Sequence, residues 1–388
     1  MSNINDYLLW RGDIPLSNKF IFNEIDSMIL ARFSYLRFDK IKMTSEETIE
    51  TISNKMRALN NEEFLYNGDK ELITNLGNSV RFKEMTVSDY IKIEDKKTEK
   101  QFGAITIHIS NKELYISFIG TDNTINGWKE DFNMSFMDNV PCQLAGKEYL
   151  EKIANKYKNK KIRIGGHSKG GNVAVYSAIT ANKDIQNRII KVYNYDGPGF
   201  SKEIIKQYGN TYIINKIETY LPQDSIIGRI LERKEKTTVV LSIEKGIYQH
   251  DIYSWQVFKN DITKLEKNTQ TSEDIRKTLT NWLNDTTIEQ RKIFIDSVFE
   301  LFYSTQANTF EDISNNLSTS IPKILKSYNE ISKEDKKLIT KMLQTFAKIY
   351  LDVIKEKENN RWLVIKERYK NESKKKIEEF EEKHFKKR

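Results

Sequence analysis

The sequence is poor in cysteine, proline and histidine, with one, five and four of them in 388 residues. The single cysteine, Cys142, excludes an internal disulfide and a zinc site built from several cysteines, and it fits a reducing compartment. The N-terminus lacks a basic segment followed by an apolar run, and no uncharged stretch approaches the roughly 18 apolar residues of a membrane span. We therefore expect a soluble, cytoplasmic protein without a transmembrane segment.

The net charge of +8 is unevenly distributed along the chain. Residues 353–388 contain 13 Lys and Arg against 8 Asp and Glu, whereas the other 352 residues contain 50 against 47. Because a nucleic-acid-binding protein should gather its basic residues on a folded domain, this distribution argues against one. We expect 353–388 to form an exposed, charged helix, with peripheral membrane contact through this tail as the alternative.

The hydrophobic pattern changes twice along the chain. Apolar residues recur at helical spacing in 20–35, whereas 104–109 and 114–119 are short β-rich runs separated by a turn. Strands then alternate with helices up to residue 258, which predicts βαβ units and a mostly parallel sheet. We expect further strands at 161–164, 188–195, 211–220 and 237–243, and helices at 143–157 and 169–182.

The strand pattern ends near residue 260. We expect helices at 272–284, 287–304, 321–330 and 333–357, and the spacing of Thr287 and Gln290 predicts a capping box. The sequence therefore predicts a domain at 1–258 that includes an N-terminal helical segment, followed by a helical region with a charged tail at 259–388.

The most informative motif is Gly166-His167-Ser168-Lys169-Gly170, which fits G-x-S-x-G. In this motif the serine occupies a tight strand-to-helix turn, and the flanking glycines leave room for the strained backbone. The helix that follows offers free N–H groups and a favourable dipole where an oxyanion forms. A β-rich run before the motif and an Ala- and Val-rich helix after it favour an α/β-hydrolase over another α/β fold with a glycine-rich turn.

Histidine is scarce enough to narrow the choice of a general base. His167 adjoins Ser168 and should point away from it, His108 precedes the serine on a strand, and His384 lies in the charged tail. His250, in a segment after the last predicted strand, is therefore the candidate that takes the proton of Ser168.

Two aspartates could orient His250. Asp196 and Asp224 both lie at strand ends between Ser168 and His250, and the spacing slightly favours Asp224 because it comes one strand later. Either aspartate could instead cap a turn. Asp251 is adjacent to His250 and poorly placed to reach its Nδ1 atom.

Several segments resemble class-3 lipases of the α/β-hydrolase superfamily, and more closely a bacterial lipase-like family described as a domain of unknown function. The resemblance covers about residues 5–258 and implies an α/β-hydrolase fold with a mostly parallel central sheet. The segments that carry it, besides the serine motif, are Asp6–Asp13, Phe22–Asp26, Phe118–Asp122, Gly127–Phe132 and Tyr195–Phe200.

The resemblance also implies roles for individual residues. Thr121 takes the oxyanion-loop position, where its N–H would act together with that of Lys169. Asp224 matches the acid of these lipases, and His250, followed by Trp255, matches their histidine. Ile119 stands where those lipases commonly have an arginine that supports the loop. Two further matching residues, Trp128 and Asp131, are expected to pack or to brace the loop.

The sequence thus predicts a serine hydrolase that cleaves carboxylic esters of small molecules or lipids. Ser168 attacks, His250 shuttles the proton and Asp224 fixes the tautomer, so the reaction needs no metal or organic cofactor. The alternative is a protein with this fold but little activity, which acts as a binding module through its C-terminal helices. A thioesterase or peptidase would use the same chemistry.

Overall fold

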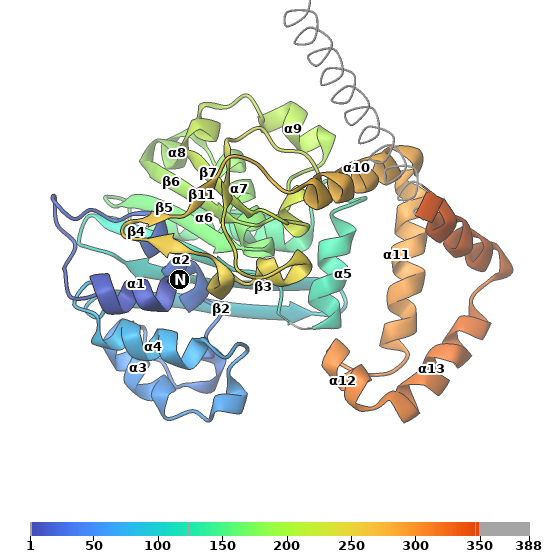
Figure 1. Ribbon diagram of the computed structural model, residues 1–388, viewed down its shortest axis with the longest axis horizontal. Coiled ribbons are helices and arrows are strands. Elements are labelled where there is room, and N and C mark those ends of the chain that lie inside the picture. The colour runs from blue at the N-terminus through green and yellow to red at the C-terminus, as the bar shows by residue number, and fades with distance from the viewer. Residues whose placement is uncertain (1, 123, 346, 349–388) are drawn as a thin grey trace, which may run out of the picture.

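The computed structural model describes residues 2–122, 124–345 and 347–348. Within this part of the chain, nine strands form one mixed sheet (Figure 1). Their order across the sheet is β1 (Glu46–Thr48), β2 (Thr86–Asp95), β3 (Lys100–His108), β4 (Glu113–Ile119), β5 (Lys161–His167), β6 (Ile189–Tyr195), β7 (Ile217–Pro222), β8 (Thr237–Val240) and β11 (Lys264–Leu265).

The centre of this sheet is parallel and its two sides are antiparallel. Strands β4 to β8 run parallel to their neighbours, whereas β1 to β4 form an antiparallel series and β11 pairs antiparallel with β8. The expected hairpin is confirmed as β3 and β4, and each later parallel strand is reached by a crossover connection, as parallel pairing requires. The carboxyl ends of β4, β5 and β6 therefore meet at one edge of the sheet.

Helices cover both faces of the sheet. One core contains the N-terminal helices α1 (Ile4–Arg11), α2 (Glu24–Phe33), α3 (Ile49–Arg57) and α4 (Asp69–Asn78). The core on the opposite face is built mainly by α6 (Pro141–Lys156) and α7 (Lys169–Thr180), with α8 (Lys183–Arg188) and α9 (Lys202–Tyr208) at its margin. The buried strands carry continuous apolar runs because both of their faces are covered.

The C-terminal helices pack beside the sheet rather than on it. They are α10 (Gln270–Asp285), α11 (Ile288–Tyr303), α12 (Phe310–Asn315) and α13 (Leu317–Glu330), and residues 333–345 are also helical. Figure 1 shows α11 alongside α5 (Ile125–Asn133), and a small apolar cluster joins the two through Ile125, Ile295 and Phe299. The expected capping box of Thr287 and Gln290 is confirmed. The rest of the predicted helix at 333–357 and the whole tail at 353–388 lie outside the described residues.

Two expectations about local structure need correction, and one segment without predicted elements turns out to be structured. The sequence pattern assigns no elements within 44–96, yet these residues hold β1, β2, α3 and α4. The strand expected at 211–220 begins only at Ile217, because residues 212–216 form a 3-10 turn, η3 (Tyr212–Lys216). Strands also continue past residue 260, since β10 (Asp261–Ile262) pairs with β9 (Val257–Phe258) and β11 closes the sheet.

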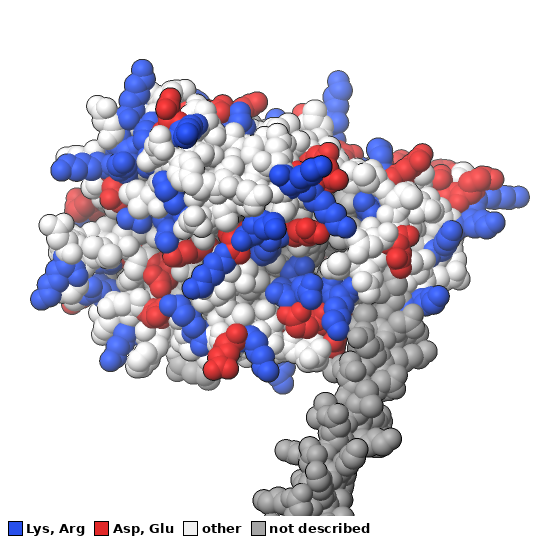
Figure 2. Space-filling view, turned by 90° about the horizontal axis from the view of Figure 1, so that it is seen from above, with Lys and Arg blue, Asp and Glu red and all other residues white. Residues whose placement is uncertain are grey.

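Charge is mixed over the visible surface. Figure 2 shows basic and acidic side chains interspersed over one face of the molecule, without a large area of a single sign. Among the helices of the described residues, none combines the length and apolarity that crossing a bilayer demands.

Candidate active site

Ser168 lies on the sharp turn between β5 and α7. Its backbone has φ 57° and ψ −133°, a strained conformation for a residue with a side chain, and its N–H donates to Tyr195 O at 2.8 Å. A Cβ atom on Gly166 would lie 2.3 Å from the Gly170 backbone, and one on Gly170 would lie 2.2 Å from Phe118 O. The glycines of the motif are therefore required by close backbone approach, as expected for a nucleophile elbow.

Asp196 is the residue that follows β6, the strand next to β5. It has φ 52°, its side chain is 1% exposed, and its N–H donates to Tyr220 O at 2.9 Å. Oδ1 accepts hydrogen bonds from Ser225 Oγ at 2.5 Å and from Gly228 N at 3.2 Å. These bonds hold Oδ1 and leave Oδ2 available for a partner beyond the sheet edge.

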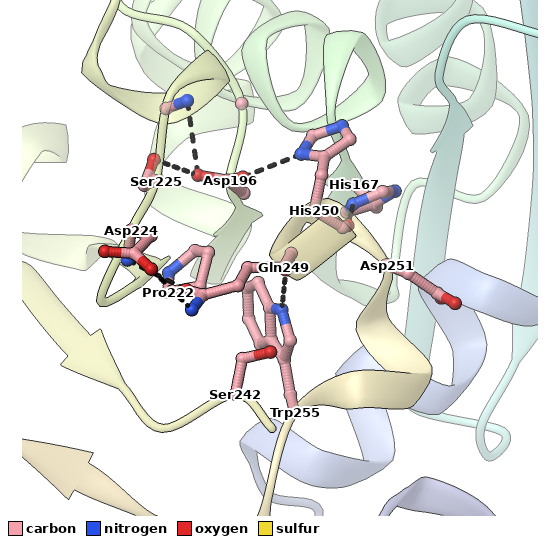
Figure 3. Close-up of polar contacts among 12 residues, drawn as sticks. His167, Asp196, Pro222, Asp224, Ser225, Ser242, Gln249, His250, Asp251 and Trp255 are labelled. Carbon is pink, nitrogen blue, oxygen red and sulfur yellow. Dashed lines mark hydrogen bonds and ion pairs between the residues drawn. The ribbon is translucent and has the colours of Figure 1, made fainter. Parts of the chain in front are cut away.

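His250 ends the short turn η5 (Gly246–His250), and its ring reaches Asp196. Nδ1 lies 2.7 Å from Asp196 Oδ2, so Nδ1–H donates to the carboxylate and Nε2 is available to accept a proton (Figure 3). Among the described residues, neither Nε2 nor the Ser168 hydroxyl makes a hydrogen bond. Contacts of this kind commonly tighten only when substrate binds.

His167 holds the backbone of His250. Its Nε2–H donates to His250 O at 2.7 Å, and the two rings lie 4.5 Å apart at 37°. Tyr35 OH donates to His167 O at 2.9 Å. Burial and the nearby charge of His250 hold the pKa of His167 well below its ordinary value, so this ring is neutral. The residue before the serine therefore faces His250, whereas the sequence predicted only that it would point away from Ser168.

The expectation that Asp224 orients His250 is not met by the geometry. Asp224 lies on the other side of Gln249 in Figure 3: its N–H donates to Gln249 Oε1 at 2.8 Å, and its Oδ2 accepts from Gln249 Nε2 at 3.0 Å. Its Oδ1 accepts a hydrogen bond from Thr269 Oγ1. Asp196 takes the position beside His250 because β6 adjoins β5, so its end is nearer to the elbow than the end of β7.

The segment that carries His250 is held in place by hydrogen bonds of Trp255 and Tyr253. Trp255 is fully buried, and its Nε1–H donates to Gln249 O at 2.7 Å. Tyr253 OH donates to Asp69 Oδ1 at 2.8 Å, and Asp69 is paired with the buried Arg32. The histidine turn is thereby joined to α2 and α4. As expected, Asp251 does not reach the His250 ring; it accepts a hydrogen bond from Tyr253 N.

Two backbone N–H groups near the turn of Ser168 are left without a partner in the described part of the chain. Thr121 follows β4, and Lys169 is the first residue of α7; in the described part of the chain, neither residue uses its N–H in a hydrogen bond. The Thr121 side chain donates through Oγ1 to Asp131 Oδ2 on α5. Burial raises the pKa of Asp131 to about 6, although the charge of Lys169 opposes this shift. Through this hydrogen bond, Asp131 holds the loop that carries Thr121 against α5.

A cavity of about 250 Å³ adjoins the loop that carries Thr121. Its wall is mostly apolar, with charged groups at its margin. Its lining residues include Tyr35, Leu36, Leu65, Ile119, Arg37 and Asp122. Within the described residues, no group of three or more His, Cys, Asp or Glu side chains is arranged to hold a metal ion.

The sequence did not identify several residues that shape this site. Ser225 and Gln249 belong to no motif, and nothing in the sequence connects them with Asp196 or His250. Tyr35 lies on the predicted helix 20–35, but its contact with His167 depends on the packing of α2 against β5. Asp196 is a candidate from the sequence, although its spacing ranks it behind Asp224.

The serine on a strained strand-to-helix turn, the parallel strands around it and the helices on both faces of the sheet define a lipase-like α/β-hydrolase architecture. This confirms the fold predicted from the sequence. The model of the Mbeg1-like family matches residues 76–300, and the chain therefore belongs to the Mbeg1-like family. No curated protein matches the chain.

Solved structures of fungal lipases are similar to the chain at low identity. A mutant form of MDLA from Penicillium cyclopium has 15% identity and a TM-score of 0.38, with 64% of this chain and 87% of that chain covered. Lipase II from Rhizopus niveus has 12% identity and a TM-score of 0.38, with 62% and 85% covered. Lip2 lipase from Yarrowia lipolytica has 11% identity and a TM-score of 0.30, with 52% and 78% covered.

Proposed function

We propose that the protein is a serine hydrolase that cleaves carboxylic esters through an acyl-enzyme. The observation that carries this proposal is the convergence of three segments: the strained turn of Ser168, the carboxylate of Asp196 on the adjacent strand, and the His250 ring bonded to that carboxylate at 2.7 Å. A nucleophile, an orienting acid and a base in this order along the chain fit acyl transfer in an α/β-hydrolase.

The proposed reaction has two halves. Ser168 Oγ attacks the ester carbonyl carbon while His250 Nε2 takes its proton, and the carbonyl oxygen becomes an oxyanion that accepts from the N–H groups of Thr121 and Lys169. The imidazolium then protonates the departing alcohol, which leaves an acyl ester on Ser168. Water, activated by the same nitrogen, releases the acid and restores the serine.

Asp196 replaces Asp224 as the proposed acid of the triad. Its carboxylate keeps the proton on Nδ1 of His250, so that Nε2 faces the serine as an acceptor, and it stabilises the imidazolium formed in each half-reaction. The two donors to Oδ1, Ser225 Oγ and Gly228 N, hold this carboxylate in its orientation. Asp224 supports the arrangement indirectly by holding Gln249.

The substrate class that the site supports is a small or lipid ester, cleaved without a metal or organic cofactor. The cavity beside the Thr121 loop has a mainly apolar wall and a volume of about 250 Å³, which fits a short acyl or alkyl group, although Ser168 and His250 do not line it. Turnover of a p-nitrophenyl ester series by wild type and Ser168→Ala tests the proposal. We expect wild type to hydrolyse short and medium chains, and equal background rates from the two proteins would contradict the proposal.

A further inference from the structure

The side chain of Lys169 is buried directly beside the proposed nucleophile. Lys169 follows Ser168 and begins α7, yet its side chain is 1% exposed and its Nζ lies 3.0 Å from Glu130 Oε2. Lysine is almost never fully buried unless it is paired. The pairing with Glu130 raises the pKa of Lys169 above its ordinary value despite burial, so the lysine keeps its proton.

Glu130 connects four elements through one carboxylate. Its side chain is 0% exposed and lies on α5. Oε1 accepts from Cys142 N at the start of α6 at 2.8 Å, and Oε2 accepts from Gln101 N of β3 at 3.0 Å as well as from Lys169. Because these donors satisfy the buried charge, the carboxylate can serve as a fixed point for α7.

The next residue of α5 holds the other half of the proposed oxyanion site. Asp131 accepts from Thr121 Oγ1, and its Oδ1 lies 3.8 Å from Lys169 Nζ. Consecutive residues of one helical turn therefore hold the two segments that offer the N–H groups, namely the loop after β4 and the first turn of α7. In the sequence, Thr121 and Lys169 are 48 positions apart.

We propose that the Lys169–Glu130 ion pair is a positioning device that fixes the Lys169 N–H relative to the Thr121 N–H through α5. The inference rests on the proposed hydrolase function and deepens it. An oxyanion site works because its donors are already in place when charge develops, and displacement of about 1 Å costs on the order of 100-fold in rate. Lys169 acts here through its side chain as a positioning residue, whereas its N–H meets the substrate oxygen.

The ion pair also explains how the loop is supported in the absence of an arginine before Gly120. Ile119 stands at that position and provides no charged contact. The support comes instead from α5, where Glu130 and Asp131 reach α7 and the Thr121 loop respectively. A hydrophobic residue in place of Lys169 would leave Glu130 with two backbone donors but without a cation in a buried site.

The test uses the full chain and a pair of substitutions that leaves no unpaired buried charge. Lys169→Met with Glu130→Gln removes both charges and keeps the side-chain sizes, whereas Lys169→Met alone would strand a carboxylate and destabilise the fold. Glu130→Gln alone is the second, milder variant. Lys129→Met is the matched control, since Lys129 precedes Glu130 on α5 but pairs with Glu99 and Asp296.

The first measurement does not depend on catalysis. Backbone hydrogen exchange of residues 118–122 and 166–172 is compared at equal distance below each melting temperature. We expect exchange in both segments to be on the order of tenfold faster in the double variant, less so in Glu130→Gln, and unchanged in Lys129→Met. Unchanged exchange in both Glu130 variants overturns the inference whether or not the protein hydrolyses esters.

The second measurement separates positioning from general stability. For an ester that wild type hydrolyses, we expect the double variant to lose on the order of 10- to 100-fold in kcat with little change in KM, because only transition-state contacts are disturbed. The Lys129→Met control should keep its kcat. An unchanged kcat in the double variant overturns the inference. If wild type itself hydrolyses no ester, the proposed function fails. The hydrogen-exchange result alone then tests whether the ion pair positions the two segments.

Discussion

His250 Nδ1 and Asp196 Oδ2 lie 2.7 Å apart although the two residues are 54 positions apart in the chain. Their contact follows from strand order: β6 is the parallel neighbour of β5, so the residue after β6 emerges beside the turn of Ser168. The positive φ of Asp196 turns its side chain away from the sheet edge and toward the histidine. The adjacent strand thus supplies the carboxylate that contacts His250.

Asp196 and Asp224 should therefore respond very differently to loss of charge. Asp196→Asn is expected to lower kcat by on the order of 10³- to 10⁴-fold, because an amide can stabilise the wrong tautomer of His250 and no longer balances the imidazolium. Asp224→Asn should cost about tenfold or less, since its side chain holds Gln249 and Thr269 and does not contact the His250 ring. Steady-state kinetics with one ester measure both, and a larger loss in Asp224→Asn would show that the acid has been misassigned.

Ser225 should affect catalysis only through its hydrogen bond to Asp196. Ser225→Ala removes the hydroxyl donor to Oδ1 but leaves Gly228 N, so we expect kcat to fall about three- to tenfold and the free energy of unfolding to fall by about 1 kcal/mol. Ser53→Ala is the control, because its hydroxyl donates to Ile73 O at 2.7 Å in the α3–α4 contact. Equal kinetic losses in the two variants would contradict a role for Ser225 at the acid.

His167 should make the protein less stable in mild acid. Its pKa is lowered in the folded chain, so below about pH 6.5 the unfolded chain binds a proton that the folded chain does not, and stability falls as the pH falls. His167→Phe removes this contribution, so the stability difference between wild type and variant should shrink by at most about 1.4 kcal/mol per pH unit between about pH 6.5 and 5. Urea unfolding across this range measures the difference, and parallel curves would refute the assignment.

Asp131 should have the opposite effect on stability. Its pKa is raised to about 6 in the folded chain, so between about pH 4 and 6 the folded chain holds a proton that the unfolded chain has released, and wild type loses stability as the pH rises. The free energy of unfolding of Asp131→Asn relative to wild type should therefore rise with pH over this range, by about 1.4 kcal/mol per pH unit at most. Above this range the difference should stay constant. A constant difference from pH 4 to 7 would show that Asp131 does not titrate there.

Local patterns predicted the elements of the hydrolase core well. The hairpin of β3 and β4, the elbow strand β5 and the helix α7 are rich in apolar and small residues, and each lies close to its expected position. Strand β2 was missed because its ladder is interrupted between Ser88 and Ile91 and its second half is mostly polar and partly exposed. The strand order across the sheet depends on long-range pairing that no local pattern encodes.

Two residues of the candidate site could be proposed from the sequence because few residues of their type fit the required chemistry. Ser168 stands out by its glycines, and His250 by the scarcity of histidine. The acid cannot be decided in this way, because Asp196 and Asp224 both follow strands and only the adjacency of β6 to β5 distinguishes them. Glu130 gives no signal either, since its contact with Lys169 requires α5 to pack against the start of α7.

The most direct test of the central claim is the identity of the residue that a fluorophosphonate modifies. Wild type is incubated with the probe at neutral pH, and the adduct is mapped by peptide mass spectrometry, with Ser168→Ala and heat-unfolded wild type as controls. The account predicts one adduct, on Ser168, which forms much more slowly in Asp196→Asn and is absent from both controls. No adduct on the folded wild type, or an adduct at another residue that persists in Ser168→Ala, would contradict it.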